Sequence, residues 1–180
     1  MFEGANLRGL AGVVIETSDP FMDALMIRPT KPDDIPAILD LAVSSGLFPS
    51  DATDELAGIL TSGLRGELGP DHLWLTDDDH GPVGVAYVAP ERMTEGTWNL
   101  YMLAIHPDRQ RQGRGAALVK HVEQQLRSRG IRLLLIETSG LGSFERTRAL
   151  YRAQGYDEEA RIRDFYKAGD DKIIFRKALG

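Results

Sequence analysis

The order of apolar and polar positions along this chain predicts a mixture of strands and helices. Apolar runs of strand type lie at 25–29, 72–76, 83–88, 97–105 and 131–136. Apolar residues with the i, i+3, i+4 spacing of helices lie at 35–42, 56–64, 118–126 and 147–154. The last two strand-like segments, 156–166 and 172–177, predict a closing hairpin. Because a strand–helix–strand unit over 97–136 stands among these elements, the pattern indicates an α/β (α+β) domain with one central mixed sheet.

The longest predicted strand breaks the simple alternation of a half-buried strand. Trp98, Leu100 and Met102 share one face, but Leu103 and Ile105 are apolar on the other face. A strand that is buried on both faces explains this pattern, and so does a β-bulge near Met102. The sequence leaves these two alternatives open.

The start of the chain predicts structure less clearly than the rest. Residues 1–24 show no sustained period and are expected to form an N-terminal extension, either separate or part of the same unit, with one short strand near 13–16. Residues 25–180 contain no linker or repeat and are expected to form one domain. Three consecutive aspartates, Asp77 to Asp79, lie between two predicted strands. We expect them to form a solvated turn rather than a set of cation ligands.

Charge and composition exclude several classes of protein. The chain has 180 residues, a formal net charge of -6 and no cysteine, which excludes disulfides, thiolate metal sites and a cysteine nucleophile. The acidic balance also argues against a nucleic-acid partner. The four histidines show no ligand spacing, so no metal is expected. The first residues do not resemble a secretory signal and no apolar run is long enough to span a bilayer, so we expect a cytoplasmic protein without a membrane partner.

A segment rich in glycine and arginine follows the longest strand. It consists of Gln110, Arg111, Gln112, Gly113, Arg114, Gly115 and Ala116. Glycines allow backbone N–H groups to point into one concavity, and the start of a helix adds partial positive charge. With Arg109, Arg111 and Arg114 around the turn, these groups predict a pyrophosphate-binding loop. Taken alone, the segment has a plainer alternative, a helix cap with surface arginines, and it matches neither the P-loop nor the dinucleotide-binding glycine pattern.

Several motifs, in this order, resemble the GNAT superfamily of N-acetyltransferases. The glycine loop matches the family's acyl-CoA loop at Gln110, Gly113 and Gly115. The strand at 133–139 matches the family's fifth strand, and the segment 150–156 matches its Leu-Tyr pair followed by a Gly-aromatic pair. The resemblance covers nearly the whole chain after its first two dozen residues, and the C-terminal segment resembles a bacterial subgroup of the family.

The resemblance implies a GNAT fold, in which a central, mostly antiparallel sheet with splayed fourth and fifth strands is flanked by helices. Acetyl-CoA would lie between those two strands as the cosubstrate, and no metal is implied. The implied acetyl-CoA-binding residues are Leu103, Ala104 and Ile105 on the strand edge, and Gln110, Arg111, Gln112, Gly113, Arg114, Gly115 and Ala116 in the loop. The backbone N–H of Leu103 would polarise the thioester carbonyl.

The resemblance also implies candidates for proton transfer. Tyr151 matches the position of the general acid that protonates the departing thiolate, and the alternative is a core tyrosine. The fourth strand carries no carboxylate, so Glu137 on the fifth strand is the candidate general base, with a structural ion pair as an equal alternative. Asp164 and Tyr166 are weaker candidates that could instead line a pocket for the acceptor.

One position departs from the family pattern. The family often has an asparagine seven residues before the tyrosine, where it hydrogen-bonds the arm of the cofactor. This chain has Phe144 there, so the contact is either lost or supplied by Ser139 or Ser143. The departure changes the expected contacts with the cofactor and leaves the expected fold intact.

The implied function is transfer of an acetyl group from acetyl-CoA to a primary amine, by direct transfer in a ternary complex. A cysteinyl acyl-enzyme is excluded because the chain has no cysteine. The acceptor could be a small molecule, a protein N-terminus or a lysine, and the chain could be a monomer or a homodimer. The alternative function is a non-catalytic acyl-CoA-binding sensor or interaction module.

Overall fold

The computed structural model describes residues 26–180, and of Ala52 only the backbone. The N-terminal extension expected over 1–24 and its short strand lie outside the described residues. The strands are β1 Met26–Pro29, β2 Leu73–Asp78, β3 Pro82–Pro90, β4 Thr97–Ile105, β5 Leu133–Ser139, β6 Asp157–Lys167 and β7 Asp170–Ala178. The α-helices are α2 Ile35–Ser44, α3 Thr53–Leu64, α4 Arg114–Ser128 and α5 Glu145–Ala153.

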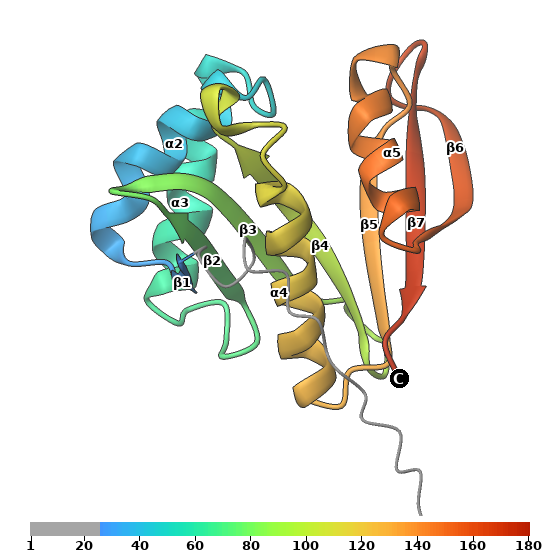
Figure 1. Cartoon of the computed structure of the whole chain (residues 1–180), viewed down its shortest axis with the longest axis horizontal. Helices are drawn as coiled ribbons and strands as arrows, with labels where there is room; N and C mark the ends of the chain where they lie inside the picture. The colour runs from blue at the N-terminus through green and yellow to red at the C-terminus, as the bar shows by residue number, and fades with distance from the viewer. Residues whose placement is uncertain (1–25) are drawn as a thin grey trace, which may run out of the picture.

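The seven strands of the described part form one sheet in the order β1-β2-β3-β4-β5-β7-β6 (Figure 1). Neighbouring strands are antiparallel except β4 and β5, which are parallel and are joined through α4. The predicted mixed sheet, mostly antiparallel and flanked by helices, is therefore confirmed, and so is the closing hairpin of β6 and β7. The sheet brings the fourth and fifth strands to its centre, next to each other.

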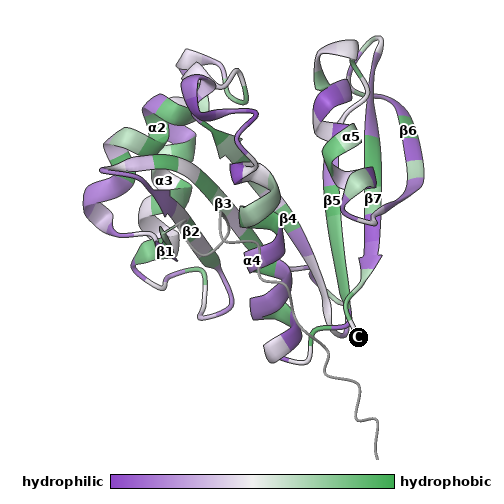
Figure 2. Ribbon diagram, in the orientation of Figure 1, coloured by the Kyte–Doolittle hydropathy of each residue, from purple (hydrophilic) through white to green (hydrophobic). Residues whose placement is uncertain are grey.

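Helices cover both faces of the sheet, and each face has its own hydrophobic core. On one face, α4 packs through Leu118, Val122 and Leu126 against strand residues such as Leu100. On the other face, α2 and α3 pack against a second set of buried residues, which includes Met102. Figure 2 shows the consequence in the pattern of hydropathy, with apolar residues along the strands and polar ones on the outer side of α4. The alternation of side chains along each strand thus supplies both cores.

The pairing of β3 with β4 explains the irregular pattern of the longest strand. Tyr87 lies opposite Met102, but Val88 lies opposite Leu100, so Tyr101 is an extra residue in β4. This is the β-bulge that one of the two sequence alternatives predicted near Met102. The other alternative, a strand that is buried on both faces, holds for the first half of β4, where all residues from Thr97 to Leu100 are buried. The bulge turns Tyr101 outward, and half of its surface is exposed.

A glycine allows β3, β4 and α4 to approach closely. A Cβ atom at Gly84 would lie 2.7 Å from Cδ1 of Ile105, 3.1 Å from Cδ1 of Leu118 and 3.2 Å from Cβ of Asp77. These distances leave no room for a side chain unless its neighbours move. Gly84 thereby sets the depth at which α4 begins above the sheet.

We expect Gly84→Ala to lower the free energy of unfolding by about 1–3 kcal/mol, the usual cost of overpacking a core. The nearest obstruction is the terminal methyl of Ile105, which valine lacks. Ile105→Val should therefore relieve part of the loss, so the double variant should be more stable than the sum of the single changes predicts. Urea unfolding of the four proteins measures this, and strict additivity would contradict the assignment of the contact.

No helix among residues 26–180 is long and apolar enough to cross a membrane.

Candidate active site

A cleft opens at the centre of the sheet because β4 and β5 separate. Their parallel pairing runs only from Thr97 opposite Leu133 to Leu100 opposite Ile136. Beyond that point the two strands diverge, as Figure 1 shows, which confirms the predicted splay. The cleft between them has a volume of about 360 Å³. It is lined by β4, β5, the loop before α4 and the start of that helix, one side of α5 and the turn that follows α2.

The edge of β4 that faces the cleft has free main-chain groups. The N–H of His106 donates to the carbonyl of Val83 on β3 at 2.8 Å. In an antiparallel pair, alternate residues bond to the partner strand, so the main-chain groups of Leu103 and Ile105 point away from β3 and toward the cleft. The Ile105 carbonyl already accepts a hydrogen bond from Nε2 of Gln110 at 3.1 Å. Leu103 and Ile105 thus leave this edge open to an extended ligand, whereas the main-chain groups of Ala104 face β3.

The loop before α4 forms a cradle of backbone donors. No hydrogen bond with another described residue occupies the N–H groups of residues 111–116. Arg111 and Gly113 have positive φ angles of 60° and 75°, which turn the chain so that these groups face a common side. Gly113 is also the N-cap of α4, whose N-terminus carries partial positive charge. These features together suit a doubly charged anion such as a diphosphate.

The structure brings most of the expected acetyl-CoA-binding residues to this cleft. Nine of the ten line it, namely Leu103, Ala104, Ile105, Gln110, Arg111, Gly113, Arg114, Gly115 and Ala116. Gln112 does not; its side-chain amide instead donates to the carbonyl of Asp108 at 3.2 Å. Phe144 also lines the cleft, in the place where the family often has asparagine.

The arginines of the loop do not contribute equally. Arg114 is 7% exposed and donates from Nη1 to both carboxylate oxygens of Asp77 at 3.0 Å, and from Nη2 to Asp79 at 2.6 Å. Nη1 of Arg109 lies 3.2 Å from the same Asp79 carboxylate. Among the described residues Arg111 makes no ion pair, so its charge alone is left free. All three arginines lie around the turn, but Asp77 and Asp79 already neutralise the charges of Arg109 and Arg114.

The expectation that the three aspartates form a solvated turn is wrong. Asp77 is fully buried beneath the start of α4, and Asp78 lies 2.7 Å from Nη2 of Arg28. Burial raises the pKa of Asp77, while the hydrogen bonds from Arg114 act in the opposite direction. The physical reason is that the β2–β3 turn packs under the loop before α4, where its carboxylates neutralise the buried Arg114 and the more exposed Arg109. The turn anchors both ends of the loop, through Arg109 and Arg114.

Tyr151 occupies the boundary between the core and the cleft. Its ring packs against Phe175 and Tyr156, with centroid distances of 5.4 and 6.1 Å, and the residue is 3% exposed. It also lines the cleft. Burial raises the pKa of its hydroxyl above the ordinary value, so the group stays protonated at neutral pH. Tyr151 is thus a core tyrosine that also presents a protonated side chain at the edge of the cleft.

Glu137 lines the cleft and also forms an ion pair. Its Oε2 lies 2.6 Å from Nζ of Lys172 on β7. That ammonium lies 3.6 Å from the centre of the Phe165 ring, and 12% of the Lys172 side chain is exposed. The structure is compatible with both alternatives for Glu137, a general base and a structural ion pair, because the ion pair exists and the residue also lines the cleft.

The remaining candidates have other structural partners. Ser139 is engaged on both sides, since its hydroxyl donates to Asp170 at 2.5 Å and accepts from the N–H of Leu141 at 3.1 Å. Asp164 accepts from the N–H of Gly169 at 2.7 Å inside the β6–β7 hairpin. Tyr166 is 47% exposed at the same hairpin. Neither Ser139 nor Ser143 lines the cleft, and no cluster of three metal-ligating side chains occurs within residues 26–180.

A tyrosine–carboxylate pair at the cleft was not identified from the sequence. Tyr101, at the bulge of β4, donates to Oε1 of Glu91 at 2.9 Å, and Asn99 donates to the same oxygen at 2.9 Å. Burial and the bond to Glu91 raise the pKa of Tyr101 to about 12. The broken alternation in the sequence indicated the bulge that turns Tyr101 outward. It did not indicate the partner Glu91, because the position of Glu91 depends on the register of β3 and β4.

Comparisons with known proteins show the family to which this chain belongs. A family model described as an acetyltransferase (GNAT) domain matches residues 69–158. A GNAT-family protein from Desulfovibrio desulfuricans is 33% identical in its crystal structure, with a TM-score of 0.81 over 87% of this chain and 100% of that chain.

A second relative is the [ribosomal protein bS18]-alanine N-acetyltransferase of Escherichia coli, 36% identical over 73 residues, which are 41% of this chain and 48% of the relative. The chain thus spans about half the length of this curated relative in the alignment. The crystal structure of the Escherichia coli ribosomal-protein-S18-alanine N-acetyltransferase covers 87% of this chain and 94% of its own, with 23% identity and a TM-score of 0.71, a likeness of fold. The chain belongs to the GNAT family of acetyltransferases.

Proposed function

We propose that residues 25–180 form an N-acetyltransferase domain that binds acetyl-CoA between β4 and β5 and transfers its acetyl group to a primary amine. The observation that carries this proposal is the meeting of three features in one cleft: the free N–H groups of residues 111–116, the open edge of β4 at Leu103, and the protonated hydroxyl of Tyr151. The three features match the three parts of a coenzyme A thioester, which are a diphosphate, a chain of amides and a thiolate leaving group that takes up a proton.

Binding would use backbone groups for most contacts. The diphosphate would accept hydrogen bonds from the loop of residues 110–116, with Arg111 as the free positive charge. The amides of the pantetheine arm would pair with the edge of β4 as an added strand does. The thioester carbonyl would then receive the N–H of Leu103, which stabilises the oxyanion that forms on attack.

The reaction would proceed by direct attack. Glu137, acting directly or through a water molecule, would take a proton from the acceptor ammonium. The neutral nitrogen would attack the thioester carbon, and the C–S bond would break as the tetrahedral intermediate collapses. Tyr151 would give its proton to the departing sulfur, and the proton that the nitrogen must still lose would pass through water to the Tyr151 phenolate. The proton on Glu137 would then go to solvent, so the products are an amide, free CoA and one proton. The chain has no cysteine to carry the acetyl group, which favours this single transfer over a cysteinyl acyl-enzyme.

The first acceptor to test is a peptide α-amine. The Escherichia coli relative is named for an alanine of ribosomal protein bS18. In this chain a carboxylate at the cleft and an aromatic ring already hold a primary ammonium, because Nζ of Lys172 lies 2.6 Å from Glu137 and 3.6 Å from the centre of the Phe165 ring. A peptide that begins with alanine, a small polyamine and a lysine-containing peptide with a blocked N-terminus separate the three classes of acceptor.

A non-catalytic acyl-CoA-binding module is the second candidate function. The observation in its favour is the Glu137–Lys172 ion pair at 2.6 Å, together with the lack of a carboxylate on β4. The two functions differ in one product. Release of free CoA that depends on an added amine supports the enzyme, whereas saturable binding without release supports the module.

We expect acetyl-CoA to raise the melting temperature of the protein, because it binds the folded state alone. At a concentration about 100 times the dissociation constant, the gain is about 2.7 kcal/mol. Thermal unfolding with and without millimolar acetyl-CoA measures it. No shift at that concentration would contradict the proposed function.

Two arginine variants serve as a matched pair for this measurement. Arg111→Gln removes the charge without an ion-pair partner among the described residues and should weaken binding most. Arg109→Gln removes a charge that Asp79 already neutralises, so its effect should be smaller. Equal losses would contradict the assignment of the free charge to Arg111.

A further inference from the structure

The inner face of α5 consists of a tyrosine and an arginine. Of its nine residues, only Arg148 and Tyr151 are buried, with 5% and 3% of their surfaces exposed. Residues three apart lie on the same side of a helix, one above the other. The proposed general acid therefore shares its buried helix face with a charged side chain that no sequence motif singled out.

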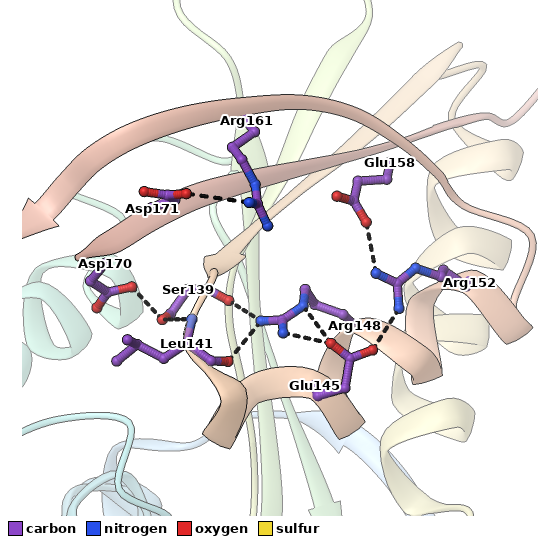
Figure 3. A network of polar contacts seen from close by, with 9 residues as sticks. All are labelled: Ser139, Leu141, Glu145, Arg148, Arg152, Glu158, Arg161, Asp170 and Asp171. Atoms are coloured by element: carbon purple, nitrogen blue, oxygen red, sulfur yellow. Dashed lines mark hydrogen bonds and ion pairs between the residues drawn. The ribbon is translucent and has the colours of Figure 1, made fainter.

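The guanidinium of Arg148 joins α5 to the end of β5 (Figure 3). Its Nη1 donates to the carbonyls of Ser139 at 2.6 Å and of Leu141 at 2.9 Å. Its Nη2 donates to Oε2 of Glu145, in the first turn of the same helix, at 2.6 Å. Ser139 is the last residue of β5, two residues after Glu137. Arg148 thus links the helix of the proposed acid to the strand of the proposed base.

The partners of Arg148 are themselves held in place. The hydroxyl of Ser139 is bonded to the buried carboxylate of Asp170 on β7, which fixes the end of β5. Arg152 bridges Glu145, at 2.9 Å, to Glu158 on β6, at 2.7 Å. Figure 3 shows these contacts as one network around the start of α5. The acceptors of the buried guanidinium therefore do not move independently of the sheet.

A polar anchor controls the position of a helix more strictly than apolar packing does. The contacts of the Tyr151 ring with Phe175 and Tyr156 are non-directional, so they tolerate small shifts of the helix. Charge-assisted hydrogen bonds from a planar guanidinium fix both distance and orientation. Such control matters in a catalytic site, where a misplacement of about 1 Å can reduce the rate about 100-fold.

We propose that Arg148 is a positioning residue, which sets α5 on β5 so that the Tyr151 hydroxyl meets the departing sulfur. This inference rests on the proposed function and extends it to a residue that does not touch the substrate. The inference requires that a substitution of Arg148 reduces kcat because it displaces the Tyr151 hydroxyl, and not because it disturbs another group.

A double-mutant cycle tests this requirement. With acetyl-CoA and the peptide that begins with alanine, Arg148→Met should lower kcat about tenfold or more, with a smaller change in KM for acetyl-CoA. In the Tyr151→Phe protein, the same substitution should have little further effect, because the hydroxyl that it displaces is absent. Arg148→Lys, which keeps the charge and one donor toward the carbonyls, should recover part of the rate.

Arg152→Met is the matched control. Arg152 lies one turn further along α5 and shares the partner Glu145, but its side chain is 44% exposed and bonds to Glu158 on β6 instead of to the end of β5. Its substitution should leave kcat nearly unchanged. If Arg148→Met does not fold, Arg148→Lys replaces it in the double-mutant cycle.

The possible outcomes separate the inference from the proposed function. Wild-type protein without turnover overturns the proposed function, and the inference falls with it. If the wild-type protein turns over, two results overturn the inference alone. In the first, Arg148→Met leaves kcat unchanged. In the second, Arg148→Met lowers kcat by the same factor in the wild-type protein and in the Tyr151→Phe protein.

Discussion

Replacing Tyr151 with phenylalanine is expected to lower kcat about 100-fold or more, since general acid catalysis contributes roughly 10²–10⁴-fold. The substitution removes one hydroxyl and keeps the ring that packs against Phe175 and Tyr156. No hydrogen bond joins that hydroxyl to another residue of the described part, so folding and acetyl-CoA affinity should change little. Steady-state kinetics measures the rate, and calorimetric titration with acetyl-CoA measures the affinity.

The pH dependence gives this prediction a second check. Because burial raises the pKa of Tyr151, the hydroxyl remains protonated across the ordinary assay range. The wild-type rate should therefore show no alkaline loss from this group up to about pH 10, the ordinary pKa of a tyrosine. Tyr156→Phe is the control, because that neighbour is also buried but does not line the cleft. An unchanged kcat in Tyr151→Phe would remove Tyr151 as the acid and leave it a core residue.

Glu137→Gln is expected to have the next largest effect, again about 100-fold or more on kcat near neutral pH, if the carboxylate is the base. The amide is nearly isosteric but cannot accept the proton of an ammonium. The loss should shrink as the pH rises, because a growing fraction of the acceptor amine is then deprotonated without help. Rates measured between neutral and alkaline pH with one amine test both parts of this prediction.

Lys172→Gln distinguishes the base from the structural ion pair. It breaks the same 2.6 Å contact as Glu137→Gln but keeps the carboxylate at the cleft. If Glu137 is the base, Lys172→Gln should retain most of the wild-type kcat. If the pair is purely structural, Lys172→Gln and Glu137→Gln should lose similar amounts of kcat and of unfolding free energy. The second pattern would also strengthen the case for a non-catalytic acyl-CoA-binding module.

Local patterns in the sequence were sufficient for the fold and for the backbone part of the site. The broken alternation at Met102 predicted an irregular strand, and the structure has a bulge at Tyr101. The glycines at 113 and 115 predicted a loop of free N–H groups, because backbone conformation depends on adjacent residues. Features that depend on short-range sequence could thus be predicted.

The ion pairs could not be predicted in this way. Arg114 meets Asp77 across 37 residues, and this contact depends on how deeply α4 packs on the β2–β3 turn. Arg148 binds two backbone carbonyls, which carry no sequence signature at all. Hydrophobic periodicity indicates which side of an element is buried, but it does not indicate which buried charges will face each other. The pairing of Arg109 and Arg114 with aspartates was therefore not predicted, and neither was the anchor of α5.

A crystal structure of the protein with acetyl-CoA bound tests the central claim most directly. We expect the diphosphate within hydrogen-bonding distance of the N–H groups of residues 111–116, and the thioester carbonyl at the N–H of Leu103. The sulfur should lie near the Tyr151 hydroxyl, with the acetyl group facing Glu137. A ligand bound outside the cleft between β4 and β5, or an empty cleft at saturating acetyl-CoA, would contradict the account.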